Sequence, residues 1–264
     1  MKDLKEKVVW ITGASSGIGE ELAYRFSREG ACPVLTARNK EELERVKNNC
    51  LGDTSKCWVQ AADLSSGKQL EELVKTVLDQ TGRIDILINN AGRSQRSWAI
   101  ETPTDIDREI MEINFFGTIT LTKLVLAHMV KKGSGHLVII SSIAGKLGFP
   151  MRTAYAASKH ALQGFFESLR TELTKYAIPV TIISPGRIRT NISVNAVTKD
   201  GRPYNKMDPG QASGMDAWKC ASQIVKAIKK DRKEVLIGKR ELIIVYIRRF
   251  FPFLYYRIVT KIKN

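Results

Sequence analysis

Residues 8–19 read VVWITGASSGIG, an apolar run followed by a glycine-rich turn, and the fold follows from this stretch. The run Val8–Thr12 predicts a buried strand, because β-branched and aromatic side chains fill it without a charge. The pattern then changes to helical spacing, which predicts a helix over Gly17–Glu29. A buried strand that leads through glycines into a helix is typical of sheets that bind nucleotides.

The turn between these two elements has the composition of a phosphate site. Glycine allows a tight turn and lets the backbone approach a phosphate, while the start of the helix offers free N–H groups to a pyrophosphate. The spacing is Gly-x3-Gly-x-Gly and not the commoner Gly-x-Gly-x-x-Gly. Glycines that serve only the turn are the alternative. The candidate residues are Gly13, Ser15, Ser16, Gly17, Ile18 and Gly19.

The same alternation of strand and helix continues along the chain. The further predicted strands are Pro33–Ala37, Cys57–Gln60, Ile84–Asn89, His136–Ser141, Val180–Ser184 and Glu234–Ile237. The further predicted helices are Lys40–Asn48, Gly67–Thr81, Asp105–Lys131, Thr153–Lys175 and Asp216–Lys230. Seven apolar strands with helices between them predict an α/β fold, a single Rossmann-like, doubly wound, seven-stranded parallel sheet with helices on both faces. Ligands of such a sheet bind beyond the carboxyl ends of its strands.

The charge of the chain is concentrated towards its C-terminus. The 264 residues carry 42 Lys/Arg and 27 Asp/Glu, a net charge of +15. Residues 226–264 hold 12 of the basic and 3 of the acidic groups, a net +9, which leaves 30 against 24, or +6, for the other 225 residues. This distribution argues against a nucleic-acid binder that is basic throughout. It predicts a globular domain over residues 1–238 and a basic, aromatic tail over residues 239–264.

Several other classes of protein are excluded. The four cysteines form no CxxC pair and the three histidines have no ligand spacing with them, so we expect no metal site and no disulfide, as suits a reducing compartment. The N-terminal residues enter a strand at once, so we expect neither a signal segment nor an N-terminal anchor. No stretch has the roughly 20 apolar residues that a spanning helix needs. We therefore expect a cytoplasmic protein.

The residues after the next three strands suggest how a dinucleotide would bind. Arg38 follows the second strand, where a protein that selects NAD usually carries a carboxylate for the ribose 2′-hydroxyl. A guanidinium suits a 2′-phosphate, so Arg38 predicts NADP(H) in preference to NAD(H), with a solvated arginine as the alternative. The candidates for the adenine and its ribose are Asp63, Leu64, Asn90, Ala91 and Gly92. Ordinary turn chemistry explains these five equally well.

The residues after the fifth strand carry the strongest chemical signal. Tyr155 and Lys159 are four residues apart in a predicted helix and therefore share one face. A free tyrosine, with a pKa of about 10, is a poor base at neutral pH, but a neighbouring ammonium lowers that pKa. Tyr155 would then exchange a proton with a carbinol or carbonyl oxygen, and Ser142 would hydrogen-bond the same oxygen. A lone Tyr-x3-Lys is common in helices, so the prediction depends on its place beside the serine and the glycine turn.

Together these residues resemble the short-chain dehydrogenase/reductase family over about residues 7–237. The resemblance rests on TGASSGIG over 12–19, NNAG over 89–92, Asn114, Ser142, Tyr155-x3-Lys159, and Ser184-Pro185-Gly186 with Thr190. It implies hydride transfer with NAD(P), with Tyr155 as the acid/base, Lys159 as its pKa-lowering and ribose-binding partner, and Ser142 as the group that orients the substrate. It also implies that Asn114 holds a water of the proton relay. The residues implied around the nicotinamide are Pro185, Gly186, Ile188 and Thr190.

Within the family, residues 150–166 and the run RRFFPFLYY over 248–256 resemble the group of dehydrogenase/reductases called member 7. The resemblance implies an NADPH-dependent oxidoreductase that interconverts a carbonyl and an alcohol on a lipophilic substrate such as a steroid or a retinoid. It also implies homodimers or homotetramers through the helices 105–131 and 153–175. A non-catalytic NADP(H)-binding scaffold or sensor at a membrane is the alternative, although the serine, tyrosine and lysine are all present.

The stretch Thr190–Trp218 contains five glycines and prolines, and its part Thr190–Gly214 shows no periodicity. Its position predicts a mobile lid over the substrate. The candidates for a lipophilic pocket are the apolar residues of this stretch and two that precede Tyr155: Val194, Val197, Met207, Met215, Trp218, Phe149 and Met151. Packing of an ordinary surface loop is the alternative.

The tail combines aromatic and basic side chains. They are Tyr246, Phe250, Phe251, Phe253, Tyr255 and Tyr256, interleaved with Arg248, Arg249, Arg257 and Lys261. The charge-free runs are too short to cross a bilayer, and Pro252 breaks or kinks any helix. Apolar area beside basic groups predicts an amphipathic helical tail that docks peripherally on an anionic membrane surface. Packing on the body or on a partner subunit is the alternative, and we expect no nucleic-acid partner.

Overall fold

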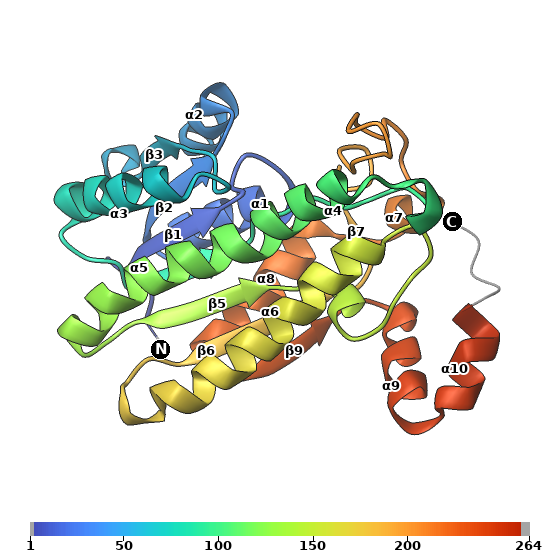
Figure 1. Cartoon of the computed structure of the whole chain (residues 1–264). Helices are drawn as coiled ribbons and strands as arrows, with labels where there is room; N and C mark the ends of the chain where they lie inside the picture. Colours follow the sequence, from blue (N-terminus) through green and yellow to red (C-terminus); the bar gives the residue numbers. More distant parts are fainter. Residues whose placement is uncertain (1–2, 260–264) are drawn as a thin grey trace.

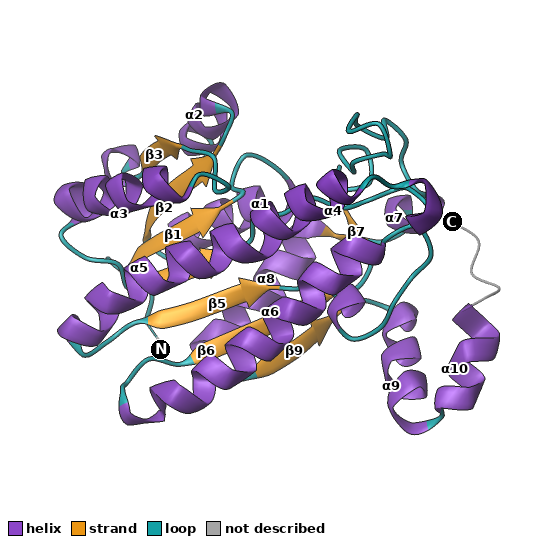
Figure 2. Ribbon diagram, in the orientation of Figure 1, coloured by secondary structure: helices purple, strands orange, loops and turns teal. Residues whose placement is uncertain are grey.

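The structure, a computed structural model, describes residues 3–259 and consists of a twisted parallel sheet between two layers of helices (Figures 1 and 2). The strands of the sheet are β1 (Val8–Thr12), β2 (Cys32–Ala37), β3 (Trp58–Ala61), β4 (Ile86–Asn89), β5 (His136–Ile140), β6 (Val180–Pro185) and β9 (Glu234–Ile237). Their order is β3-β2-β1-β4-β5-β6-β9, and every neighbouring pair is parallel. The predicted Rossmann-like, doubly wound sheet is confirmed.

Helices cover both faces of the sheet because strand side chains alternate between two cores. The helices on one face are α1 (Gly17–Arg28), α2 (Lys40–Asn48) and α8 (Ala217–Lys229), and those on the other are α3 (Gly67–Thr81), α5 (Gly117–Lys132) and α6 (Thr153–Glu172). Val9 and Ile11 of β1 pack under α1 and α8, whereas Val8 and Trp10 pack under α3, α5 and α6. Because both faces are buried, apolar and polar residues do not alternate along the strand. Each of these large side chains contributes about 1.5–3 kcal/mol to the free energy of folding through its burial.

The sheet changes its direction of growth between β1 and β4, and this point places the candidate site. The chain passes from β1 to β2 and β3 on one side and then continues through β4, β5, β6 and β9 on the other. The loops after β1 and β4 therefore diverge and open a crevice at the carboxyl ends of the strands. Thr12 joins the two loops, since its hydroxyl accepts the N–H of Asn90 at 3.0 Å and of Ala91 at 3.1 Å.

The predicted helix over residues 105–131 is interrupted. Three segments follow one another: α4 (Thr104–Met111), a π-helical turn (Glu112–Phe116) and α5 (Gly117–Lys132). Gly117 approaches the backbone of Leu64 so closely that a Cβ would lie 2.3 Å from the Leu64 carbonyl oxygen. Asn114, in the π turn, is fully buried. Such turns are frequent at functional sites, because they redirect one side chain.

Taken together, Thr104–Lys132 is long and apolar enough to cross a membrane by length and composition, contrary to the expectation that no stretch would be. In the structure Leu121, Val125 and Met129 of this helix pack into the core on the sheet. The core accounts for part of its apolar character, since 39% of the most apolar part of this helix is buried.

Most other predicted elements lie within two residues of the observed bounds. The strand β4 starts at Ile86 instead of Ile84, because the carboxylate of Asp85 accepts the N–H of Val8 at 2.9 Å and takes the place of a strand carbonyl. Short 3-10 turns cover Thr54–Lys56, Ala99–Glu101, Ile143–Gly145, Leu173–Lys175 and Arg240–Leu242.

The segment over residues 190–214, expected to be irregular, is bounded by a small sheet. Its elements are β7 (Ile188–Arg189), α7 (Pro209–Ala212) and β8 (Met215–Asp216), with β7 and β8 parallel. The Met215 N–H donates to the carbonyl oxygen of Arg187 at 2.8 Å, so both ends of the segment lie beside the end of β6. Its mobility as a lid stays a prediction.

The tail forms a helical hairpin at one end of the molecule (Figure 1). Its helices are α9 (Ile243–Phe250) and α10 (Pro252–Val259). Pro252 begins the second helix, where a missing N–H is tolerated. The predicted helical tail is confirmed, whereas a domain boundary at residue 238 stays a prediction and Lys261 lies outside the described residues.

Two side chains attach this hairpin to the loop after β5. The Tyr255 hydroxyl donates to the carbonyl oxygen of Gly148 at 2.8 Å, and Arg248 Nε donates to the carbonyl oxygen of Lys146 at 2.9 Å. The Arg248 guanidinium also lies 5.4 Å from the centroid of the Tyr255 ring. Tyr255 is therefore buried against the body, as the alternative of a tail that packs on the body requires for this residue.

Candidate active site

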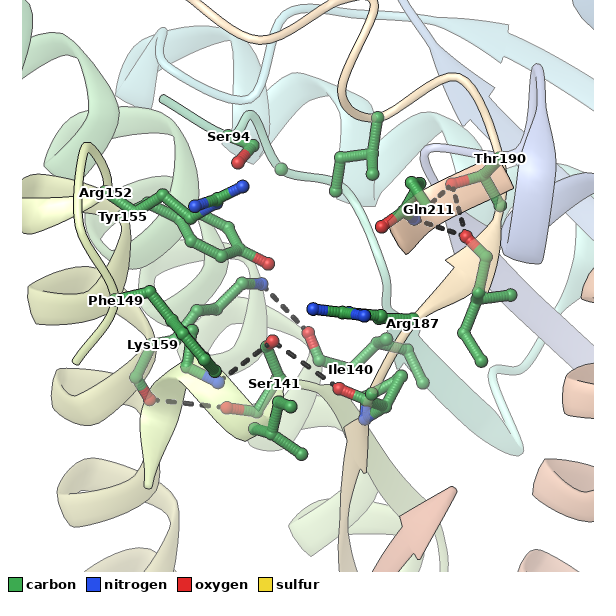
Figure 3. A pocket seen from close by; sticks show the side chains of 18 of the residues that line it. Ser94, Ile140, Ser141, Phe149, Arg152, Tyr155, Lys159, Arg187, Thr190 and Gln211 are labelled. Atoms are coloured by element: carbon green, nitrogen blue, oxygen red, sulfur yellow. Dashed lines mark hydrogen bonds between the residues drawn. The ribbon is translucent and has the colours of Figure 1, made fainter. Parts of the chain in front are cut away.

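Tyr155, Lys159 and Ser142 meet at the carboxyl end of β5, in the wall of one cavity (Figure 3). Tyr155 and Lys159 lie one turn apart on α6, and the Lys159 ammonium is 5.9 Å from the centroid of the Tyr155 ring. Lys159 Nζ donates to the carbonyl oxygen of Ile140 at 3.0 Å, which holds it at the end of the strand. Ser142 caps the turn after β5, since its Oγ accepts the N–H of Ala144 at 3.1 Å, and it donates to the carbonyl oxygen of Pro185 at 3.5 Å. Its hydroxyl is close enough to Tyr155 to act on the pKa of the phenol.

Burial dominates the protonation of this cluster. Burial raises the pKa of the Tyr155 phenol, and the nearby Ser142 hydroxyl and the charges of Arg96 and Arg152 oppose that rise. Burial also lowers the pKa of the Lys159 ammonium to about 8. For the protein alone, the expectation of a lowered tyrosine pKa is therefore wrong. The reason is that the desolvation of both groups outweighs any attraction between them.

Asn114 lies behind the cavity wall and not among the residues that line it. Its Oδ1 accepts the N–H of Arg93 at 2.8 Å, and its Nδ2 donates to the carbonyl oxygen of Arg93 at 2.9 Å and to Ser158 Oγ at 3.0 Å. A Cβ on Gly92 would lie 3.0 Å from Asn114 Oδ1 and 3.5 Å from Lys159 Nζ. The absence of a side chain at Gly92 therefore lets the amide and the ammonium lie close together.

Two adjoining cavities bring together nearly all the predicted cofactor residues. The first, of about 500 Å³, is lined by Gly13, Ser15, Ser16, Gly17, Ile18, Arg38, Asp63, Leu64, Asn90, Ala91, Gly92 and Thr190 among others. The second, of about 190 Å³, is lined by Ser142, Tyr155, Lys159, Pro185, Gly186 and Ile188 among others. They share six lining residues, Ile18, Asn90, Gly92, Ser94, Thr190 and Ile192, so one continuous space extends from the glycine turn to Tyr155. The roles of the individual residues stay predictions.

Gly19 does not line either cavity, and its function is packing. A Cβ on Gly19 would lie 2.2 Å from the carbonyl oxygen of Gly13 and 2.6 Å from Asn90 Nδ2. Gly13 and Gly17 have φ of +65° and +59°, which side chains rarely adopt. The turn thus requires glycine for its backbone at two positions and for the close approach of the helix at the third.

The side of the first cavity next to β2 and β3 carries one basic side chain, Arg38, and one acidic side chain, Asp63. Arg38 is exposed, and no hydrogen bond or ion pair is found for its guanidinium within residues 3–259. The Asp63 carboxylate is hydrogen-bonded within its own turn. Its Oδ1 accepts the N–H of Ser65 at 3.0 Å and the hydroxyl of Ser65 at 2.8 Å. Although burial opposes it, these bonds and the Arg38 charge lower the Asp63 pKa.

The second cavity has a more polar wall than the sequence suggested. Seven polar lining residues were not predicted as site residues: Ser94, Arg96, Ser141, Arg152, Arg187, Asp208 and Gln211. Phe149, an apolar candidate from the sequence, also lines the cavity. None of the other six apolar candidates, Met151, Val194, Val197, Met207, Met215 and Trp218, lines it. Val197 is instead fully buried in a small separate core, and Trp218 is exposed.

Only one of the polar residues had a sequence signal. Arg187 directly follows Pro185-Gly186 at the end of β6, the position from which a parallel strand presents ligand-binding residues. Arg96 and Asp208 are 112 residues apart, and no local pattern connects them. Only the return of the 190–214 segment over the strand ends brings them together.

The comparison with known families agrees with this geometry. The family described as short chain dehydrogenase matches residues 7–201. The match covers more than half of the chain, so the chain belongs to the short-chain dehydrogenase family, whose members are oxidoreductases that bind a nicotinamide cofactor.

The similar proteins place it near one group of that family. The "Dehydrogenase/reductase SDR family protein 7-like" of Drosophila melanogaster is 43% identical over 263 residues, with 98% of this chain and 81% of the relative covered. The "Dehydrogenase/reductase SDR family member 7B" of Mus musculus is 43% identical over 262 residues, with 97% and 81% covered. The crystal structure of a short-chain dehydrogenase from Streptomyces avermitilis superposes with a TM-score of 0.81 at 28% identity, covering 96% of both chains. The predicted resemblance to the member 7 group is confirmed.

Proposed function

We propose that this short-chain dehydrogenase is an NADP(H)-dependent enzyme that interconverts a carbonyl and an alcohol on a lipophilic substrate. The observation that carries the proposal is the position of Tyr155, Lys159 and Ser142 in a cavity that continues into a dinucleotide-sized one. When bound, the nicotinamide supplies or accepts the hydride. The residues of this chain position the substrate and move the proton.

Tyr155 acts as the proton donor in the reducing direction. Its raised pKa keeps the phenol protonated, so it gives a proton to the carbonyl oxygen as the carbon receives the hydride. In the oxidising direction Tyr155 must first be deprotonated, and its phenolate oxygen then accepts the proton of the alcohol. Ser142, which lines the same cavity, holds the reacting oxygen beside the phenol. Lys159 and Asn114 take the roles that the family resemblance implies. Lys159 acts on the tyrosine and binds the ribose, and Asn114 holds a water of the proton relay.

The test is turnover by the full chain with an aldehyde and ketone panel, followed at 340 nm with NADPH and NADH. Tyr155→Phe should lower kcat by about 10²- to 10⁴-fold, as expected for loss of a general acid, and leave NADPH binding unchanged. Retained turnover in Tyr155→Phe would remove the tyrosine from its role. A wild-type protein that binds NADPH but reduces no carbonyl would favour a scaffold or sensor instead.

The preference for NADP(H) depends on Arg38. Its exposed guanidinium lines the first cavity, where it can hold a 2′-phosphate through two parallel hydrogen bonds. Arg38→Glu should reverse the NADPH/NADH preference, whereas Lys40→Glu makes the same change of charge two residues away, outside the cavity lining, and should change it much less. An unchanged preference in Arg38→Glu would show that the arginine is only solvated.

A lipophilic substrate and a membrane surface are proposed together. Ile143, Phe149, Ile188 and Ile192 give the second cavity an apolar side. A neighbouring cavity of about 700 Å³ shares Ile143 and Phe149 with it and extends to Ile244 of α9, so the tail borders the approach to the substrate.

The hairpin supplies the proposed membrane contact. Six of its large apolar side chains are more than half exposed: Ile243, Tyr246, Phe250, Phe251, Phe253 and Tyr256. Sedimentation with vesicles that contain anionic lipid should deplete the wild type from the supernatant, and Phe250→Ser with Phe253→Ser should remain in it. Both positions are exposed, so the fold stays intact. Equal recovery of both proteins at low salt would contradict the membrane proposal.

A homodimer or homotetramer through α4–α5 and α6 is also proposed. Phe116, on the outer side of the π turn, is 46% exposed beside the partly buried Phe115 and Phe165, as an apolar contact between copies would need. Light scattering of Phe116→Glu against the wild type tests it, and an unchanged mass would contradict this interface.

A further inference from the structure

The substrate cavity contains more positive charge than the reaction requires. Besides Lys159, three arginines line it, Arg96, Arg152 and Arg187, and the only carboxylate among its lining residues is Asp208. The two guanidiniums nearest to Tyr155, those of Arg96 and Arg152, act on its pKa, so this charge lies close to the reacting oxygen.

Arg96 and Arg152 share one carboxylate. Arg96 Nε lies 3.0 Å from Asp208 Oδ2, and Arg152 Nη2 lies 3.0 Å from the same oxygen. The side chains of Arg96 and Asp208 are 4% and 13% exposed, so the cluster is largely removed from water. Both guanidiniums therefore lie against the same carboxylate, in surroundings where charged groups are costly unless they are paired.

Arg187 differs from Arg96 and Arg152. Hydrogen bonds hold its backbone in place, while its guanidinium faces the cavity and can bind a ligand. Its N–H donates to Glu241 Oε1 at 2.9 Å, and its carbonyl oxygen accepts the N–H of Met215. The guanidinium packs over Gly210, where a Cβ would lie 2.7 Å from Cζ, and points into the cavity towards the wall that carries Tyr155 (Figure 3). No hydrogen bond or ion pair is found for it in the part of the chain that the structure describes.

We propose that Arg187, supported by the Arg96–Asp208–Arg152 cluster, binds an oxyanion on the substrate, a carboxylate or a phosphate, close to the carbonyl that is reduced. This inference rests on the proposed carbonyl–alcohol chemistry and narrows its substrate to an anionic, partly apolar compound. A guanidinium binds both oxyanions through two parallel hydrogen bonds. Arg187 lines the substrate cavity and not the cavity of the glycine turn, so the cofactor pyrophosphate is not the anion it holds.

The kinetic test compares matched pairs of substrates on the full-length protein with NADPH. The pairs are medium-chain keto acids with their methyl esters, and phosphorylated hydroxyketones with the free hydroxyketones. Arg187→Met keeps the aliphatic stem over Gly210 and removes the charge. The variant should lower kcat/KM for the anionic substrates by about 10- to 100-fold, mainly by raising KM, as expected for the loss of a charge-assisted hydrogen bond. It should change kcat/KM for the neutral substrates by less than about twofold.

The matched control is Arg189→Met, in β7, two residues further along the chain. Arg189 is 61% exposed, pairs with Asp216 and does not line the cavity, so both classes of substrate should be unaffected. Equal losses for charged and neutral substrates in Arg187→Met, or a wild type that prefers the neutral partners, would overturn the proposal. A fall in NADPH affinity in Arg187→Met would assign the arginine to the cofactor and also overturn it.

A binding measurement separates this proposal from the proposed chemistry. Calorimetric titration of the NADP⁺-loaded protein with octanoate, octyl phosphate and octanol should show binding of the anions, lost in Arg187→Met and kept in Tyr155→Phe. The stronger of the two anions identifies the oxyanion. If no carbonyl is reduced but the anions bind through Arg187, the chemistry fails and the anion site stands. If carbonyls are reduced but neither anion binds more tightly than octanol, the anion site fails alone.

Discussion

Replacing Lys159 by methionine should stabilise the protein at neutral pH. Lys159 is 4% exposed at the carboxyl end of β5, and burial lowers the pKa of its ammonium from 10.5 to about 8. The unfolded chain therefore binds this proton more tightly than the folded protein does. Methionine has a similar length and no charge, so Lys159→Met removes the cost of burying an ammonium and leaves little cavity.

The magnitude follows from the two pKa values and one hydrogen bond. The difference between 10.5 and about 8 corresponds to a cost of roughly 3 kcal/mol at neutral pH. The hydrogen bond of 3.0 Å from Nζ to the Ile140 oxygen is lost in the variant, which offsets about 1 kcal/mol. The net gain in the free energy of unfolding is about 2 kcal/mol. Since the unfolded chain binds the extra proton between about pH 8 and 10.5, the wild type recovers stability as the pH rises through that window.

Urea unfolding of the cofactor-free proteins at neutral pH and at about pH 9.5 measures this difference. The gain of Lys159→Met over the wild type should fall from about 2 to below about 1 kcal/mol between the two pH values. Lys75→Met, on the exposed side of α3, is the control and should stay within about 0.5 kcal/mol of the wild type. A variant less stable than the wild type at neutral pH, or a difference that does not depend on pH, would refute the reasoning.

Two further changes test the packing and the acid side of the stability curve. Gly19→Ala should destabilise the protein by about 1–3 kcal/mol and weaken NADPH binding, because its Cβ would lie 2.2 Å from the Gly13 oxygen. Gly164→Ala, an open position in α6, should stabilise by about 0.5–1 kcal/mol, and equal thermal midpoints for the two variants would contradict the distinction. Burial lowers the pKa of His136 to about 4, so the wild type should lose stability, by up to roughly 3 kcal/mol, as the pH falls from about 6.5 towards 4. His136→Gln, which keeps a partner for Thr181, should flatten that loss in urea unfolding below pH 6, and an unchanged slope would exclude His136 as its cause.

The helix over residues 105–131 shows where local pattern stops being informative. Its apolar spacing predicts a continuous helix, and both ends are correct to within one residue. The π turn that buries Asn114 arises from contacts with Arg93 and Leu64, which are distant in sequence. A prediction from neighbouring residues has no access to such contacts.

The sequence by itself determined the sheet and the cluster of Ser142, Tyr155 and Lys159. Strand and helix periodicity are local properties, and the carboxyl ends of parallel strands meet at one edge whatever the loops do. It also located the tail as a separate basic and aromatic segment.

Only the tertiary structure decided the chemistry around that cluster. Whether the tyrosine pKa rises or falls depends on how completely the site is buried, and burial is set by every element packed over it. The cationic wall depends on Asp208 returning to Arg96 across 112 residues. Charge pairing in a cavity is a matter of distance in space, which sequence separation does not reveal.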